Sequence, residues 1–134
     1  MIEEVISRKN MLRAMYQVQK NHGSAGVDQM HVTKLSELMS IDKDTLTGKV
    51  RSGEYLPHPI LGIHIPKGEG KYRLLGIPTV TDRMLQQAVL QVISARFEFG
   101  FSENSYGFRP KKNMHQAVQK AQGYINDGYQ NIVN

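Results

Sequence analysis

The 134-residue sequence contains no cysteine. This absence excludes disulfide scaffolds, iron–sulfur clusters, thiolate zinc sites and cysteine nucleophiles, and it agrees with a reducing compartment such as the cytoplasm. The sequence also lacks any apolar run near the roughly 20 residues that a membrane-spanning helix needs. Residues 1–4 include two acidic residues and precede no long apolar stretch, so we expect no secretory signal. These absences predict a cytoplasmic protein that does not contact a membrane.

Motifs for catalysis are absent as well. The histidines show no metal-ligand spacing. No pair of carboxylates lies within an apolar, glycine-flanked segment, and neither a phosphate-binding loop nor a nucleophile elbow is present. We therefore assign no catalytic residue and no metal ligand. Surface or hydrogen-bonding roles are expected for the five histidines, which are His22, His31, His58, His64 and His115.

Positive charge is unevenly distributed. Seventeen Lys and Arg against twelve Asp and Glu give a net charge of +5. Residues 1–60 hold eight basic and seven acidic residues, whereas residues 61–120 hold nine basic and four acidic residues. A basic middle favours an anionic partner, of which nucleic acid is the commonest; ordinary solubilising charge is the alternative.

The spacing of apolar residues predicts an α+β fold that is mostly helical and carries one β-hairpin. Met11, Leu12, Met15 and Val18 recur at helical spacing, Gly23 follows as a terminator, and Thr33 is suited to cap the next helix. Prolines and alternating apolar residues then mark two strands joined by a glycine-rich turn. The expected segments are a helix that ends near 22, a loop at 23–28, helices at 33–39 and about 42–52, a hairpin at about 60–77, a helix at about 82–97, a loop at 100–110, a helix at about 113–126 and a strand at 129–134.

The expected last strand has no partner in this sequence. A domain rarely ends inside a strand, so we expect the chain to be the first part of a longer protein. The strand residues Ile132 and Val133 would join a sheet formed by the remainder of that protein.

The hairpin carries three cationic residues near its turn. Lys71 and Arg73 are two residues apart, so on a strand they share a face, and Lys67 lies across the turn. Lysine supplies a point charge and arginine a bidentate fork, which suits a triphosphate or a nucleic-acid backbone. A solvated turn without a ligand is the alternative.

The loop at 101–110 combines aromatic residues with cations. Aromatic side chains can stack on bases while cations hold phosphates. Arg109 lies in this loop, and Lys111 and Lys112 follow it. In the alternative interpretation, Tyr106 and Phe108 fill the core and Arg109 pairs with a backbone carbonyl.

Three motifs resemble the N-terminal part of bacterial group II intron reverse transcriptases, also called intron-encoded maturases. The first is Asn-His-Gly-Ser-Ala-Gly-Val-Asp at 21–28, similar to the family's Asn-x-Gly-x-x-Gly-Val-Asp-Gly loop. The second is Ile-Pro-Lys at 65–67 with Arg-Leu-Leu-Gly-Ile-Pro-Thr-Val-Thr-Asp-Arg at 73–83 and Gln-Gln at 86–87. The third is Phe-Ser at 101–102 with Ser-Tyr-Gly-Phe-Arg-Pro at 105–110, followed by His115 and Ala117. Their order and spacing agree with the family over nearly the whole chain.

The resemblance implies the fingers of a right-hand polymerase, truncated at the start of the palm. Residues 1–56 would form an N-terminal helical extension with a template-lid loop at about 22–31, residues 57–128 the fingers, and residues 129–134 the first palm strand. Lys67 and Arg73 would contact the triphosphate of the incoming nucleotide. The expected template or RNA contacts are Arg13, Lys20, Asn21, Gly23, Gly26, Lys71, Arg109, Lys111 and Lys112.

Two departures from the family pattern stand out. Leu61 and Gly62 occupy the place of a pair of arginines in the first hairpin strand, so one phosphate contact is missing or supplied elsewhere. Gln29 replaces the last glycine of the first loop, which leaves open whether that turn keeps its conformation.

The resemblance also implies a partner list and a missing catalytic centre. The family's metal-binding aspartates lie beyond residue 134, so we expect this chain to be inactive alone and to bind no metal, while the longer enzyme uses Mg²⁺ for RNA-directed DNA synthesis. Its partners would be group II intron RNA, an RNA template with a DNA primer, and dNTP, in a bacterial cytoplasm.

Three alternatives remain open. One is a non-catalytic RNA-binding module that grips RNA through Arg8, Lys9, Arg13 and Lys20 of the first helix. Another is the fingers of a domesticated relative, associated with CRISPR arrays or with diversity-generating elements. The third is self-association into a homodimer through apolar surface on the last helix and final strand.

Overall fold

The computed structural model describes residues 1–41 and 43–131, and the chain forms two compact units. The first is Met1–Ser94 and the second is Ala95–Asn134. The described residues combine helices with one two-stranded antiparallel sheet, which confirms the predicted α+β class. None of the described helices is both long and apolar enough to cross a membrane.

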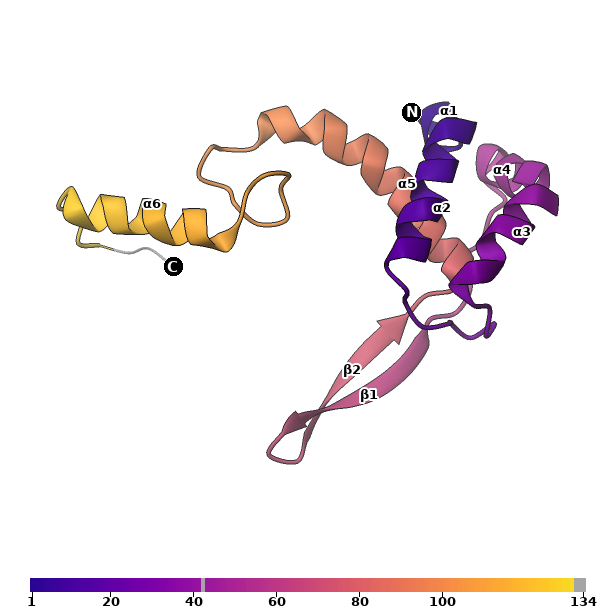
Figure 1. Ribbon diagram of the computed structural model, residues 1–134, viewed down its shortest axis with the longest axis horizontal. Coiled ribbons are helices and arrows are strands. Elements are labelled where there is room, and N and C mark those ends of the chain that lie inside the picture. Colours follow the sequence, from indigo (N-terminus) through magenta and orange to yellow (C-terminus); the bar gives the residue numbers. More distant parts are fainter. Residues whose placement is uncertain (42, 132–134) are drawn as a thin grey trace. The chain divides into compact units, whose positions relative to one another are not determined.

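Five α-helices and a 3-10 turn build the first unit around an apolar core (Figure 1). Met11, Ala14 and Val18 recur along one face of the second helix and are buried; the predicted periodicity is right for Met11 and Val18, whereas Leu12 is exposed. They pack in one cluster with Leu35 and Met84, which are both fully buried. The elements are α1 (Ile2–Val5), α2 (Arg8–Lys20), η1 (Val32–Lys34), α3 (Leu35–Ile41), α4 (Lys43–Ser52) and α5 (Val80–Phe97), whose last three residues belong to the second unit.

Two helix starts differ from the sequence prediction. Thr33 is not the cap of the segment that leads into α3: His31 is, because its ring nitrogen Nδ1 accepts the backbone N–H of Thr33 at 3.5 Å. Helix α5 begins at Val80, two residues earlier than expected. There, Oγ1 of Thr79 accepts the N–H of Asp82 at 3.2 Å and so caps the first turn.

The predicted hairpin is confirmed. Strands β1 (Leu61–Gly68) and β2 (Lys71–Ile77) pair antiparallel, with an irregularity between Pro66 and Gly68. Positive φ angles at Gly68, Glu69 and Gly70 form the turn. Figure 1 shows the hairpin extending away from the helices of its unit. Most of its side chains are exposed, so both faces of its free end meet solvent.

The second unit contains η2 (Glu98–Gly100), an ordered loop and α6 (Met114–Asn126). A capping box between Asn113 and Gln116 starts α6, close to the predicted boundary. Residues 129–131 have no regular secondary structure, so the strand predicted for 129–134 is wrong over these residues. The remainder of that prediction, 132–134, lies outside the described residues. No residue of this unit is buried within its described part, 95–131.

Candidate nucleic-acid interface

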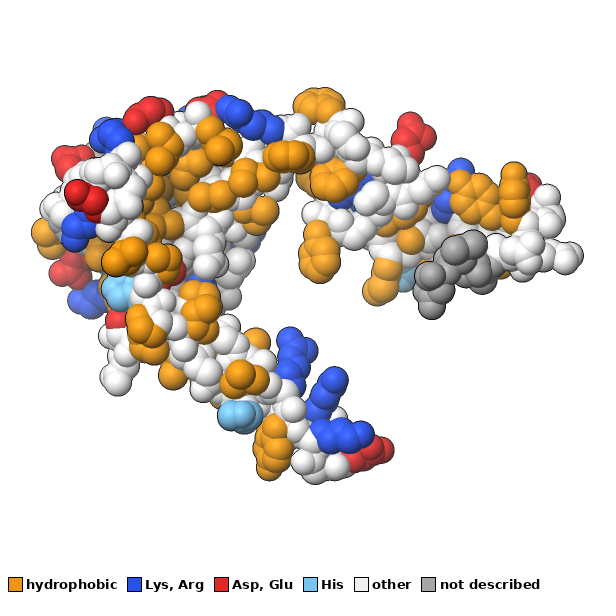
Figure 2. Space-filling model, turned by 180° about the vertical axis from the view of Figure 1, so that it is seen from behind, with side chains coloured by type: hydrophobic (Ala, Val, Ile, Leu, Met, Phe, Trp, Pro, Cys, Tyr) orange, Lys and Arg blue, Asp and Glu red, His pale blue; other side chains and the backbone are white. Residues whose placement is uncertain are grey.

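The register of the hairpin brings its cations to one face. Arg73 pairs with Ile65, and Lys71 lies two residues from Arg73 on the same face of β2. Lys67 is the extra residue at the irregularity beside them. Figure 2 shows the Lys and Arg side chains gathered on one side of the free end of the hairpin.

These cations are exposed and almost unpaired. Within residues 1–41 and 43–131, neither the Lys67 nor the Arg73 side chain has a hydrogen-bond or ion-pair partner. Nζ of Lys71 lies 3.8 Å from Oε2 of Glu69, and both side chains are exposed, so this pair contributes little. The face therefore offers an arginine fork and a lysine point charge to an external anion.

The first loop motif packs against the segment that leaves the hairpin. Gly26 is buried, and a Cβ atom there would lie 2.8 Å from the backbone N of Thr79. The guanidinium of Arg83 lies against Gly23, and its Nη2 donates a 2.5 Å hydrogen bond to the carbonyl of Ser24. The first and second motifs, separated in sequence, thus form one piece of structure.

Gln29, which stands where the motif that this loop resembles has its last glycine, keeps a glycine-like backbone conformation. Gln29 has a φ of +56°, in the left-handed region that glycine adopts most easily. Its N–H donates to the carbonyl of Gly26 at 3.1 Å, and Asp28 accepts the N–H of Met30 at 3.2 Å. The substitution therefore leaves a tight turn in place.

Beside this loop lies a hollow of about 410 Å³ between the end of α2 and helix α5. Its polar lining consists of Asn21, Arg83, Gln86 and Gln87, and its apolar lining of Val18 and Leu90. Nε of Arg83 is buried without a hydrogen-bond partner among the described residues. Sequence reasoning assigned no site role to Arg83, Gln86 or Gln87. Their i, i+3, i+4 spacing, which places them on one helix face, was the signal that could have found them.

Helix α2 carries a second set of exposed cations. Lys9, Arg13 and Lys20 are spaced by four and seven residues, so they follow one face of the helix, and exposed Tyr16 lies between them. Arg8 is also exposed but is turned from Lys9 by about 100°. This stripe alternates cations with an aromatic ring, as single-stranded nucleic-acid sites do.

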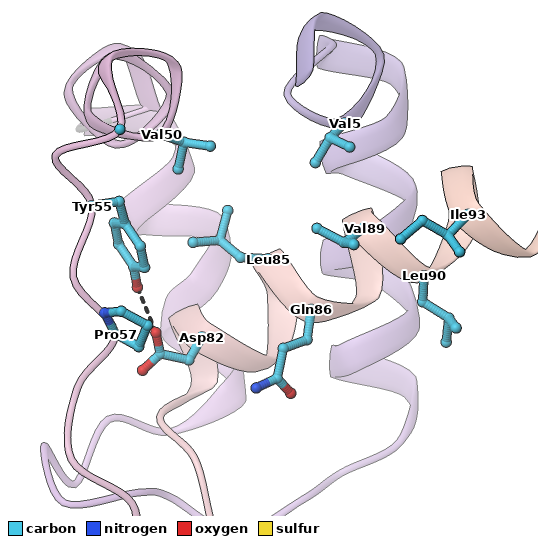
Figure 3. A pocket seen from close by; sticks show the side chains of 11 residues that line it. Val5, Val50, Tyr55, Pro57, Asp82, Leu85, Gln86, Val89, Leu90 and Ile93 are labelled. Carbon is cyan, nitrogen blue, oxygen red and sulfur yellow. Dashed lines mark hydrogen bonds between the residues drawn. The ribbon is translucent and has the colours of Figure 1, made fainter. Parts of the chain in front are cut away.

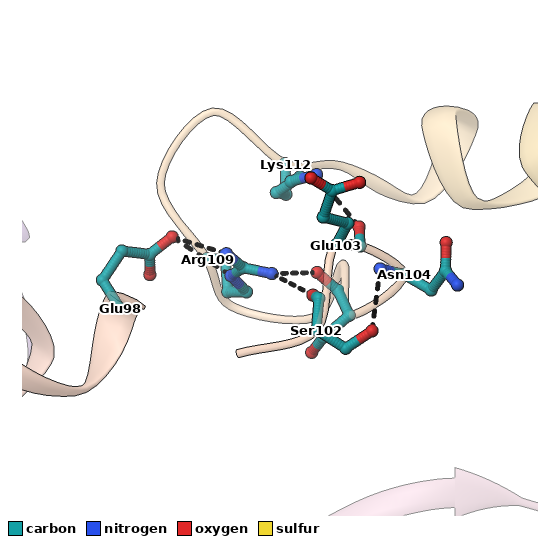
Figure 4. A network of polar contacts seen from close by, with 7 residues as sticks. Glu98, Ser102, Glu103, Asn104, Arg109 and Lys112 are labelled. Carbon is teal, nitrogen blue, oxygen red and sulfur yellow. Dashed lines mark hydrogen bonds and ion pairs between the residues drawn. The ribbon is translucent and has the colours of Figure 1, made fainter. Parts of the chain in front are cut away.

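In the second unit, Arg109 is bound within its own loop (Figure 4). Its Nε and Nη2 donate to Oε1 of Glu98 at 3.1 and 2.9 Å, and Nη1 donates to the carbonyls of Ser102 and Ser105 at 2.6 and 2.9 Å. The side chain is 11% exposed and its guanidinium lies 5.3 Å from the ring centre of Phe101. The structure therefore shows the pairing with backbone carbonyls that the sequence left open.

The side chains near Arg109 differ in whether they contact the loop or point away from it. Nζ of Lys112 donates to the carbonyl of Glu103 at 3.1 Å and lies 5.0 Å from the ring centre of Tyr106. Phe108 is fully exposed, so the interpretation that it fills a core is wrong within the described residues. Lys111 is exposed at a φ of +61°. The loop therefore presents Phe108 and Lys111 outward.

A buried carboxylate lies at the base of the hairpin (Figure 3). Oδ1 of Asp82 accepts the hydroxyl of Tyr55 at 2.7 Å; Oδ2 accepts the N–H of His58 at 3.1 Å and the hydroxyl of Thr79 at 2.6 Å. Burial alone would raise the pKa of Asp82, but hydrogen bonds from Thr79, Tyr55 and His58 hold the pKa below its usual value. Burial and the bond to Asp82 raise the pKa of Tyr55.

Asp82 also borders an apolar pocket of about 530 Å³ along α5 (Figure 3). Val5, Val50, Leu85 and Val89 line it, and among the described residues that line it only Asp82 is acidic. Among these lining residues, the groups suited to acid–base chemistry are Asp82 and Tyr55, and they are already hydrogen-bonded to each other.

No metal centre is evident in the described part of the chain. Among residues 1–41 and 43–131, no three His, Asp or Glu side chains gather closely enough to hold a metal ion. The Mg²⁺ expected for the longer enzyme stays a prediction.

Comparisons with known proteins relate the chain to intron-encoded proteins. Protein YkfC of Escherichia coli is 35% identical over 108 residues, which are 81% of this chain and 28% of that protein. The group II intron-encoded protein LtrA of Lactococcus lactis is 38% identical over 71 residues, 52% of this chain and 12% of LtrA. An uncharacterized 91 kDa protein in the cob intron of Schizosaccharomyces pombe is 34% identical over 82 residues, 60% of this chain and 10% of that protein.

No family model matches the chain. The chain corresponds to less than a third of the length of the relatives named above. The similarity to LtrA supports a relationship to group II intron-encoded reverse transcriptases and maturases, in agreement with the sequence motifs.

Proposed function

We propose that this chain is the fingers region of a group II intron-encoded reverse transcriptase or maturase, and that its hairpin binds nucleic-acid or nucleotide phosphates. The main observation behind this proposal is the exposed cationic face formed by Lys67, Lys71 and Arg73. The similarity to LtrA supports the family, and the basic middle of the chain supports an anionic ligand.

The chemistry of binding follows from the residue types. Arg73 can offer two parallel N–H donors to a phosphate, and Lys67 can add a point charge from the turn. The loop around Gly26, braced on the hairpin's base, would lie along a template strand. In the longer enzyme Mg²⁺ would supply activation of the primer hydroxyl, held by carboxylates outside this chain. The proposal for this chain is confined to binding.

The test is RNA binding by the chain itself. A labelled single-stranded RNA of mixed sequence is titrated with the wild type and with Lys67→Ala/Arg73→Ala, and affinity is followed by fluorescence anisotropy over a range of salt. We expect an affinity loss of about tenfold and a salt slope smaller by about 1.4, because two phosphate contacts disappear.

The matched control is Lys34→Ala/Lys120→Ala, which removes the same charge. Lys34 pairs with Glu37, and Lys120 lies over Tyr124; neither lysine belongs to the hairpin. Equal losses in the two double variants would show that only net charge matters. Competition by dNTP tests the nucleotide assignment, since dNTP should displace RNA from the hairpin only if both use it.

A second candidate function, an RNA-binding module acting through α2, is favoured by the stripe of Lys9, Arg13, Tyr16 and Lys20. The variant Lys9→Ala/Arg13→Ala/Lys20→Ala should then weaken RNA binding and lower the salt slope by about 2. Unchanged RNA affinity in this folded variant would exclude the α2 assignment.

A further inference from the structure

The direction of the hairpin is set at its base. Its strands pair with each other, and most of their side chains are exposed. Six residues separate Leu61 at the base from Lys67, which at strand rise is roughly 20 Å. A tilt of about 10° at the base would therefore move the cations by about 3.5 Å, more than a phosphate contact tolerates.

One carboxylate contacts both ends of the hairpin segment. Tyr55 and His58 precede β1, whereas Thr79 follows β2, and all three donate to Asp82 in the first turn of α5. Nδ1 of His58 also lies 3.3 Å from Oδ2, where it adds an ion pair when protonated. Because the Asp82 side chain is 5% exposed, water competes little for these bonds.

We propose that Asp82 is a positioning residue for the cationic hairpin: its buried carboxylate fastens the incoming and outgoing ends of the hairpin to α5 and thereby aims Lys67 and Arg73. This role deepens the proposed function and rests on it for its biological purpose. The geometry itself is testable without any ligand.

The absence of cysteine permits clean labelling. Two spin labels are attached at Tyr16→Cys on α2 and Tyr72→Cys near the hairpin turn, both exposed positions of the first unit. Pulsed electron–electron double resonance then measures the distribution of distances between the two labels. In Asp82→Asn we expect a distribution clearly broader than in the wild type, with helical circular dichroism retained.

The matched control is Asn10→Ala. Asn10 donates to the carbonyls of Val5 and Ala88 at 2.8 and 2.9 Å, so its loss destabilises the helices without touching the hairpin. We expect a lower melting temperature and an unchanged distance distribution. If Asp82→Asn does not fold, the distances are measured instead in Tyr55→Phe and Thr79→Val, each of which removes one hydrogen bond to Asp82 from one end of the hairpin. An unaltered distribution in the folded variants would overturn the positioning role.

RNA binding separates this role from the proposed function. Asp82→Asn should weaken RNA affinity roughly fivefold, as loss of a charge-assisted contact would. In the Asp82→Asn background, Lys67→Ala/Arg73→Ala should reduce RNA affinity by a smaller factor than it does in the wild type, because the Asp82 substitution already weakens the contact that these cations make. A broadened distribution in Asp82→Asn, with RNA affinity unchanged both there and in Lys67→Ala/Arg73→Ala, would leave the positioning role in place and refute RNA binding by the hairpin.

Discussion

At the scale of single residues, Gly26 shows how one missing Cβ joins two distant motifs. Its place against Thr79 leaves no room for a side chain, because the obstructing atoms are backbone. We expect Gly26→Ala to lower the free energy of unfolding by about 1–3 kcal/mol, the range for overpacking. Urea denaturation of the variant and the wild type measures this difference in the free energy of unfolding.

Gly48→Ala is the control for this substitution. Gly48 lies inside α4, and beyond its chain neighbours and the helix's own backbone no described heavy atom would lie within 4 Å of a Cβ there. Alanine at this position should therefore stabilise the protein by about 0.5–1 kcal/mol. Equal stability of Gly26→Ala and wild type would contradict the packing of the loop on Thr79.

Asp82 predicts an acid-sensitive fold. Its folded-state pKa lies below the unfolded value of about 3.9, so its stabilisation is present above that pH and is lost as pH falls through the folded pKa. Urea denaturation at a series of pH values should show stability falling below about pH 4 in the wild type. In Asp82→Asn this fall should be smaller, and stability near neutral pH should be lower.

The contribution of Glu3 to the loss of stability in acid must be distinguished from that of Asp82. Its hydrogen bond with Arg51 also lowers its pKa, but the pair is exposed. Glu3→Gln should therefore leave most of the acid-side fall in place. If Glu3→Gln flattens the profile and Asp82→Asn does not, the assignment to Asp82 is wrong.

At the scale of elements, Arg109 organises the loop between η2 and α6. Four hydrogen bonds from one guanidinium fix Glu98, Ser102 and Ser105. Arg109→Lys cannot reproduce this fork, so amide hydrogen exchange over residues 98–112 should accelerate by at least about tenfold. Lys111→Ala, which removes an exposed cation, should leave exchange in that loop unchanged; acceleration there would show that charge rather than the fork holds the loop.

At the scale of the whole molecule, the second unit exposes the apolar face of α6. Val118 and Ile125 are 67% and 63% exposed, and Tyr129 beyond the helix is 68% exposed. We propose that these faces pair between chains, since exposed apolar patches favour association. Sedimentation velocity at two concentrations should show a larger species at the higher one, and Val118→Lys should remove it.

Leu56→Lys is the control for self-association. Leu56 is 82% exposed and belongs to the first unit, so its substitution makes the same change of charge at an exposed apolar residue outside α6. A single concentration-independent monomer in the wild type would refute the homodimer.

Local pattern alone was enough to predict most of the longer elements. The spacing of Met11 and Val18 marks α2, and the glycines of the turn mark the hairpin with its boundaries nearly as observed. These features depend on neighbours within a few residues, which is the range that periodicity and turn chemistry report. The cationic face of the hairpin follows from the same period of two.

Contacts between distant residues were decided by the tertiary structure. Asp82 looks in sequence like an ordinary first-turn acid, and only folding places Tyr55 and His58 against its carboxylate. Arg109 looks like a free cation until Glu98 and two carbonyls take its donors. Residue type and spacing thus determined which charges and elements the chain has. Which charges are buried and which stay free for a ligand depended on long-range packing, because burial and hydrogen-bond partners are properties of the folded chain.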